Sequence, residues 1–101
     1  MLRTVLTLCP RQGARETVLS LYQESGILEL AVREAGCLAT ELQVAADPAA
    51  PLLVTALWPS RAEYEAWATH PARAELAGRL LSLLADAHLD EYEVVARAVH
   101  G

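Results

Sequence analysis

Three of the five aromatic side chains in this sequence lie within ten positions, and they are the residues best suited to bind or act on a flat organic molecule. Trp58 ends an apolar run before Pro59. Tyr64 and Trp67 follow on the next predicted helix, where a spacing of three places them on one face. An indole N–H or a phenol hydroxyl adds a hydrogen-bonding group to a large apolar surface. The cluster predicts a pocket wall, with ordinary core packing as the alternative.

His70 is a further chemical candidate, because a histidine side chain can transfer a proton near neutral pH. It directly precedes Pro71, which favours the first position of a helix, so a loop or capping role is the structural alternative. We expect His88 near a helix C-terminus and His100 in a frayed tail. No histidine pairs with a cysteine or carboxylate at a metal-ligand spacing, so no metal site is predicted.

Other catalytic patterns are missing from the sequence. The serines have no nucleophile-elbow motif, and there is no glycine-rich phosphate loop. Glu91 and Glu93, with Asp90 beside them, are typical of a solvated strand edge rather than an acid–base pair. Cys9 and Cys37 show no CxxC spacing, so we expect both to be buried structural thiols.

Composition narrows the classes of partner. Hydrophobic residues make up 53% of the 101 residues, yet no apolar run approaches the length of a membrane span. The formal net charge is −5, and all eight basic residues are arginines without a basic stripe, which argues against nucleic acid. The apolar part of the N-terminal segment around Arg3 is too short for a secretory signal, so we expect a cytoplasmic protein.

Hydrophobic periodicity predicts alternating strands and helices in one domain over residues 1–101. Strands are expected over residues 2–9, 37–45, 52–58 and 89–99. Helices are expected over residues 14–34, from the Ser60 cap to about residue 68, and from Pro71 onward. The buried stripe of the last helix should consist of Leu76, Leu80, Leu83, Leu84 and Ala87. Ser60 and Glu63 form a predicted capping box. Gly26 lies inside the first predicted helix and suggests a kink there.

The element order β-α-β-β-α-β predicts an α+β ferredoxin-like fold, with both helices on one face of a four-stranded antiparallel sheet. The other sheet face should expose the apolar side chains of Val5, Cys9, Leu53 and Leu57. Such a face needs a cover, and a symmetric homodimer packed sheet on sheet supplies one.

Three segments resemble the antibiotic biosynthesis monooxygenase family of small dimeric α+β barrels. They are the TVLTL pattern of the first strand, the step Ala35-Gly36-Cys37, and Leu57-Trp58-Pro59-Ser60-Arg61-Ala62-Glu63-Tyr64, which is similar to the family's Trp-x-Ser-x-x-x-Tyr segment. Anthrone-type members oxidise aromatic polyketides with molecular oxygen and no cofactor. Their strand-end tryptophan matches Trp58 and their helix tyrosine matches Tyr64. Val54 occupies the position where these members have an asparagine. Their helix arginine corresponds to a position near Ala77, and Arg73 and Arg79 are the displaced substitutes for it in this sequence.

Haem-degrading members of the same family offer a second comparison. Their helix tryptophan matches Trp67, but their histidine ligand again falls near Ala77, and this sequence has no asparagine at all. The resemblance therefore implies weak or absent haem binding.

We expect a mostly apolar pocket for a flat aromatic ligand, with Trp58, Tyr64 and His70 as catalytic candidates and Trp67, Tyr22 and Val54 as substrate-binding candidates. The resemblance favours a cofactor-independent monooxygenase or related tailoring enzyme acting on an aromatic polyketide-like small molecule. The alternative is a non-catalytic dimeric module that binds an apolar small molecule or haem.

Overall fold

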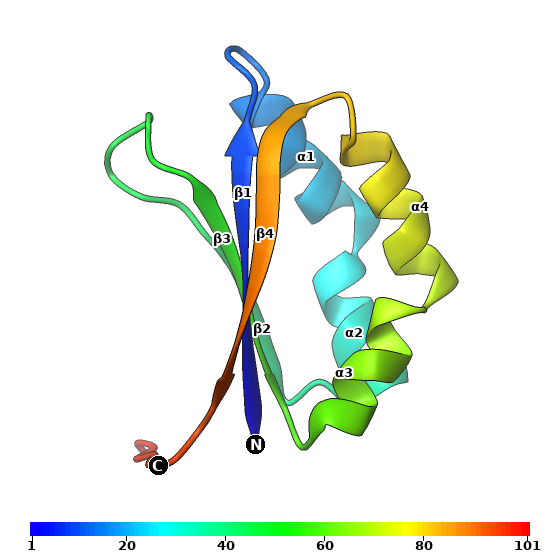
Figure 1. Ribbon diagram of the computed structural model, residues 1–101, viewed down its shortest axis with the longest axis vertical. Coiled ribbons are helices and arrows are strands. Elements are labelled where there is room, and N and C mark those ends of the chain that lie inside the picture. The colour runs from blue at the N-terminus through cyan, green and yellow to red at the C-terminus, as the bar shows by residue number, and fades with distance from the viewer.

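Four strands form one twisted sheet, and all the helices cover the same face of it (Figure 1). The computed structural model describes residues 1–101. In chain order the elements are β1 (Leu2–Pro10), α1 (Arg15–Ser25), α2 (Ile27–Ala35), β2 (Ala39–Gln43), β3 (Leu52–Trp58), α3 (Arg61–Ala68), α4 (Pro71–Leu80) and β4 (Leu84–Glu93). The strand order is β2-β3-β1-β4, and every neighbouring pair is antiparallel. The predicted ferredoxin-like arrangement is confirmed.

The alternation in β1 decides which side chains face the helices. Leu2, Thr4 and Leu8 are buried, and Thr4 pairs across the ladder with Ala56 of β3. Residues directly opposite in an antiparallel pair share a face, so the helix-side face is continuous from β1 into β3. The core on this side also contains Val18, Ile27, Leu52, Trp58, Tyr64, Leu76 and Leu80.

The single helix predicted over residues 14–34 is wrong, because the structure divides it into α1 and α2 at Gly26. Gly26 has a φ of +67°, a left-handed conformation that glycine adopts without a side-chain penalty. It ends one helix and begins the next. Gly36, with a φ of +73°, ends α2 as expected.

Side chains cap both helices that follow β3. The Ser60 hydroxyl accepts the Ala62 N–H, and the Glu63 carboxylate accepts a hydrogen bond from that hydroxyl. This bond lowers the pKa of Glu63. The predicted capping residues are confirmed, with Ala62 rather than Glu63 supplying the amide that Ser60 caps.

The boundary between the last helix and the last strand differs from the prediction. α4 ends at Leu80 and β4 begins at Leu84, so Leu83, Leu84 and Ala87 do not continue a helical stripe. β4 ends at Glu93, and residues 95–99 are outside the sheet. Pairing explains the difference, because β1 supplies partners for β4 from Leu84 to Glu93. The strand predicted over 37–45 likewise shortens to Ala39–Gln43.

The sheet face away from the helices is only partly the apolar surface that was predicted. Val5, Cys9 and Leu53 are half-buried there, but Leu57 is 1% exposed and therefore already covered within one chain. Arg97, beyond β4, borders the same shallow depression as Leu57. Leu57 is thus part of the protein interior, and the prediction that it is exposed for an interface is wrong.

None of the helices has the length and apolar character needed to cross a membrane. Cys37 is buried, and its thiol donates to the carbonyl oxygens of Ala39 and Leu57 at 3.3 and 3.5 Å. Burial raises the pKa of the Cys37 thiol, which keeps it in the unreactive protonated form. The expectation of a buried thiol holds for Cys37, whereas Cys9 is half-buried.

Candidate active site

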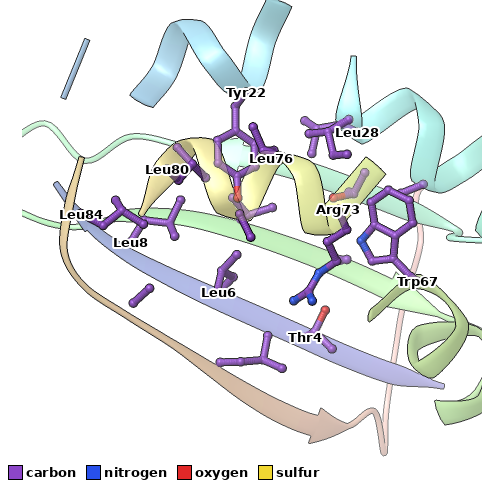
Figure 2. Close-up of a pocket in the computed structure, with 18 of the residues that line it drawn as sticks. Thr4, Leu6, Leu8, Tyr22, Leu28, Trp67, Arg73, Leu76, Leu80 and Leu84 are labelled. Carbon is purple, nitrogen blue, oxygen red and sulfur yellow. The ribbon is translucent and has the colours of Figure 1, made fainter. Parts of the chain in front are cut away.

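A cavity of about 480 Å³ lies between the helices and the helix-side face of the sheet. Of the 22 residues that line it, 18 are hydrophobic, and Figure 2 shows many of them converging from β1, α1 and α4. The lining residues are Thr4, Leu6, Leu8, Tyr22, Ile27, Leu28, Ala31, Thr40, Val54, Ala56, Tyr64, Trp67, Arg73, Leu76, Ala77, Leu80, Leu81, Leu84, Ala85, Asp86, Ala87 and Leu89. The predicted apolar pocket therefore exists.

The mouth of the cavity lies between α4 and β4. Ala77 and Leu81 on the helix side and Ala85 on the strand side all line the cavity and are exposed to solvent. Leu81 is 78% exposed. An apolar ligand that approaches from solvent would therefore contact apolar side chains at the mouth before it enters the cavity.

Tyr22 extends from α1 into the cavity, as Figure 2 shows. Its side chain is buried, and its hydroxyl makes no hydrogen bond within the chain. Burial raises the pKa of Tyr22 to about 12, although the positive charge of Arg73 acts in the opposite direction. Tyr22 therefore stays protonated at neutral pH and can donate a hydrogen bond, but it is not a general base there.

Arg73 is the only cationic residue that lines the cavity. Its guanidinium donates to the carbonyl oxygen of Ala68 at 3.4 Å, and it forms no salt bridge. Figure 2 shows the guanidinium beside Thr4 and Trp67, at one end of the cavity. We call this end, formed by Thr4, Trp67 and Arg73, the polar end.

Trp58 does not line the cavity, contrary to the prediction that it forms part of the pocket wall as a catalytic candidate. It is 1% exposed, and its indole N–H donates to the Thr4 hydroxyl at 3.0 Å. The N–H is therefore occupied. Thr4 does line the cavity, and its own O–H makes no hydrogen bond within the chain. Trp58 therefore contacts two residues that line the cavity, Thr4 and Tyr64, but not the cavity itself.

Tyr64 and Trp67, both from the buried face of α3, line the cavity as expected. Tyr64 packs edge to face on Trp58, with ring centroids 5.6 Å apart and planes at 66°. The indole N–H of Trp67 makes no hydrogen bond within the chain, and Figure 2 shows it directed towards Arg73. These two residues give the cavity an aromatic wall with polar atoms.

His70 lies outside the cavity and caps α4. Its Nδ1 accepts the Ala72 N–H at 3.1 Å, while Nε2 lies 3.1 Å from Oε1 of Glu34. Because Nδ1 is an acceptor, Nε2 holds the ring hydrogen and donates to Glu34. This geometry favours the capping role, because both ring nitrogens have partners within the chain, and the proton-shuttle role of His70 stays a prediction.

The profile of the family described as antibiotic biosynthesis monooxygenase matches residues 1–79. The chain belongs to this family. No curated protein sequence is significantly similar to it.

Solved structures agree with the family in fold. Rv0793 from Mycobacterium tuberculosis superposes with a TM-score of 0.85 at 18% identity, covering 97% of this chain and 98% of the other. A protein from Deinococcus radiodurans, named as a candidate antibiotic biosynthesis monooxygenase, gives 0.85 at 19% identity and full coverage of both chains. A third structure, named antibiotic biosynthesis monooxygenase, gives 0.80 at 22% identity, covering 95% of this chain and 100% of the other. At these identities the likeness shows the fold alone.

In this member of the family, two residues without a motif complete the polar end. Thr4 looks like any residue of an alternating strand, so only the pairing of β1 with β3 places it beside the cavity. Arg73 precedes Ala77 by four residues, one helical turn, and both line the cavity. The family resemblance names Arg73 as a displaced substitute for the family's arginine, and this spacing is the sequence signal that favours Arg73 over Arg79, which does not line the cavity. Val54 also lines the cavity, as expected.

Proposed function

We propose that the protein is a cofactor-independent monooxygenase, or a related tailoring enzyme, that acts on an aromatic polyketide-like small molecule. One observation supports this proposal above all. The cavity is apolar along most of its length, while hydrogen-bond donors from four different elements enter it: Thr4 from β1, Tyr22 from α1, Trp67 from α3 and Arg73 from α4. An apolar body with a few placed polar groups is typical of a site for an aromatic ligand.

The proposed reaction converts a benzylic CH₂ group next to a phenol or ketone into a carbonyl. The substrate passes a proton to a water molecule and becomes an enolate, whose carbon transfers electrons to O₂ and forms a C–O bond. The peroxide anion formed in this way then takes a proton back. The resulting hydroperoxide loses water, so CH₂ and O₂ give C=O and H₂O. Arg73 and the Thr4 hydroxyl would stabilise the enolate oxygen, because donors aimed at a developing anion act strongly in a dry cavity.

The other residues have different roles in this proposal. Tyr64 donates to, or exchanges a proton with, the reacting oxygen, and Trp67 stacks on the aromatic body. Trp58 is a positioning residue that holds the Thr4 hydroxyl, and His70 is structural. We also propose that the active species is a homodimer formed through the sheet face that bears Val5 and Leu53, since these half-buried side chains offer apolar surface there.

A specific feature also favours the alternative, a non-catalytic binding module. Apart from Asp86, which is exposed, the cavity is lined by no carboxylate and no histidine that could remove a proton. For haem, the lining residues able to bind iron are Tyr22 and Tyr64. This alternative predicts tight binding of an aromatic molecule without turnover.

Oxygen uptake distinguishes the two functions. Chelator-treated protein should consume one O₂ per anthrone oxidised, and Ala77→Trp should abolish the uptake by filling the mouth. Ala74→Trp, on the same helix but outside the cavity, is the matched control and should retain activity. Saturable binding of anthrones and quinols without oxygen uptake would leave the binding module as the better description.

A further inference from the structure

We propose that the ligand of this cavity is an aromatic molecule bound as an anion, with its negatively charged oxygen group at the polar end beside Arg73. This inference deepens the proposed function and rests on it for the identity of the site. It adds a requirement on the ligand: a neutral polycycle of the same shape should bind markedly more weakly than its anionic counterpart.

The first reason is the position of Arg73 on its helix. Arg73 is the third residue of α4, and the first turn of α4 contains no acidic residue. The N-terminal end of a helix has a partial positive charge, so a cation is unfavourable there. Helix stability therefore does not explain this residue, whereas an anion held nearby would compensate both charges.

The second reason is the missing counter-ion. Arg73 is half-buried among apolar side chains, and none of the five ion pairs in the protein includes it. Its single hydrogen bond, to Ala68, uses one of the five N–H donors of a guanidinium. A partly desolvated cation with unused donors is costly unless an acceptor completes it.

The third reason is that the surrounding polar groups are also free to donate. The Thr4 oxygen already accepts the Trp58 N–H, which leaves its O–H for a ligand. The Trp67 indole N–H can only donate. Further along the cavity, the raised pKa of Tyr22 keeps that hydroxyl protonated, so it is a donor as well. The ligand must therefore supply acceptors at this end, and a carboxylate or an ionised phenol supplies them best.

The length of the cavity limits the rest of the ligand. Thr4, Leu6 and Leu8 line it along β1. Four residues of antiparallel strand span about 13 Å. This length suits two or three fused rings extending from the polar end along the leucines, with no second charge at the far end, where Leu80 and Leu84 lie (Figure 2).

A pair of fluorescent probes tests the inference directly. 1-Anilinonaphthalene-8-sulfonate and N-phenyl-1-naphthylamine have the same ring system and differ by one sulfonate. The anionic probe should bind the wild-type protein at least 10-fold more tightly. Arg73→Gln should weaken the anionic probe about 10-fold or more, consistent with the loss of one charged hydrogen bond, and leave the neutral probe within about 2-fold.

Three control variants separate a specific effect of Arg73 from changes in net charge or folding. Arg79→Gln removes a charge from the same helix outside the cavity and should change neither affinity. Arg73→Lys keeps the charge and should retain part of the preference for the anionic probe. This variant keeps the test decisive if Arg73→Gln fails to fold. Ala77→Trp should block both probes.

Three results would overturn the inference: equal affinities for the two probes, an unchanged preference in Arg73→Gln, or anionic binding that survives Ala77→Trp. The last result would mean that the anionic probe binds outside the cavity, for example in the depression bordered by Arg3 and Arg97. Because the assay needs no turnover, charge preference without oxygen uptake would refute the monooxygenase and leave this inference standing.

Discussion

The indole N–H of Trp58 donates to the hydroxyl of Thr4 at 3.0 Å, which joins the C-terminal end of β3 to the first half of β1 beneath the helices. Trp58 pairs across the ladder with Leu2, so this bond runs diagonally to the next residue on the same face. The bond satisfies a fully buried donor and at the same time fixes the rotamer of a hydroxyl that lines the cavity.

Thr4→Val should destabilise the protein by about 1–3 kcal/mol, because it keeps the side-chain shape but leaves the buried Trp58 N–H without an acceptor. The free energy of unfolding in urea measures the effect. Thr40→Val is a matched control at the edge strand β2, where water can replace the bond from Thr40 to Thr55, and it should cost about 0.5 kcal/mol or less. Equal costs for the two variants would contradict the structural role given to the Trp58–Thr4 bond.

Tyr64→Phe should lower the rate of oxygen uptake by ~10²–10⁴-fold with little change in KM, as expected when a group acting in general acid–base catalysis is removed. Trp67→Phe keeps an aromatic wall but reduces its area, so it should mainly raise KM. Tyr92→Phe changes a tyrosine outside the cavity and should have no effect. Full activity in Tyr64→Phe would remove Tyr64 from the chemistry.

His70→Ala should cost about 1 kcal/mol of stability through loss of the cap on α4, and His70→Asn should restore most of it, because asparagine is a good capping residue. Thermal denaturation measures the cost. Oxygen uptake should be the same in both variants and the wild type. An equal loss of activity in both, without a change in stability, would support the predicted catalytic role of His70.

Alkaline pH should reveal the raised pKa of Tyr22. Since the folded protein keeps this proton to about pH 12 while the unfolded chain loses it near pH 10, the stabilisation is complete below pH 10 and is lost between pH 10 and 12. Two pKa units correspond to about 2–3 kcal/mol. The free energy of unfolding should therefore fall more steeply over this interval in the wild type than in Tyr22→Phe. If the free energy of unfolding fell equally steeply with pH in the wild type and in Tyr22→Phe, the raised pKa of Tyr22 would be disproved.

Sedimentation equilibrium at micromolar concentration should give about twice the chain mass of 10.9 kDa. Leu53→Glu should shift the protein towards one chain mass, since it places a charge on the sheet face proposed as the interface. Leu81→Glu adds the same charge at the exposed cavity mouth and should leave the mass unchanged. Leu57 is unsuitable for this test, because it is buried within a single chain.

Local chemistry in the sequence was enough to predict much of this protein. The alternation of β1, the Ser60 cap, Pro71 at the start of α4 and the shared face of Tyr64 and Trp67 depend on residues a few positions apart, and all appear in the structure. The order of these elements also predicted the sheet topology, because few connections are compatible with short loops and right-handed crossovers.

Contacts between distant residues determine where α4 gives way to β4 and which polar side chains enter the cavity. Leu84 and Ala87 fit a helical stripe as well as a strand, and pairing with β1, more than 70 residues earlier, selects the strand. Trp58 is withdrawn from the site because Thr4, 54 positions away, accepts its N–H. The Arg73 side chain enters the cavity because α4 turns the face that carries Arg73 towards the sheet. No local pattern in the sequence specifies a distant hydrogen-bond partner or the side of a helix that meets a sheet, so these features come from tertiary packing.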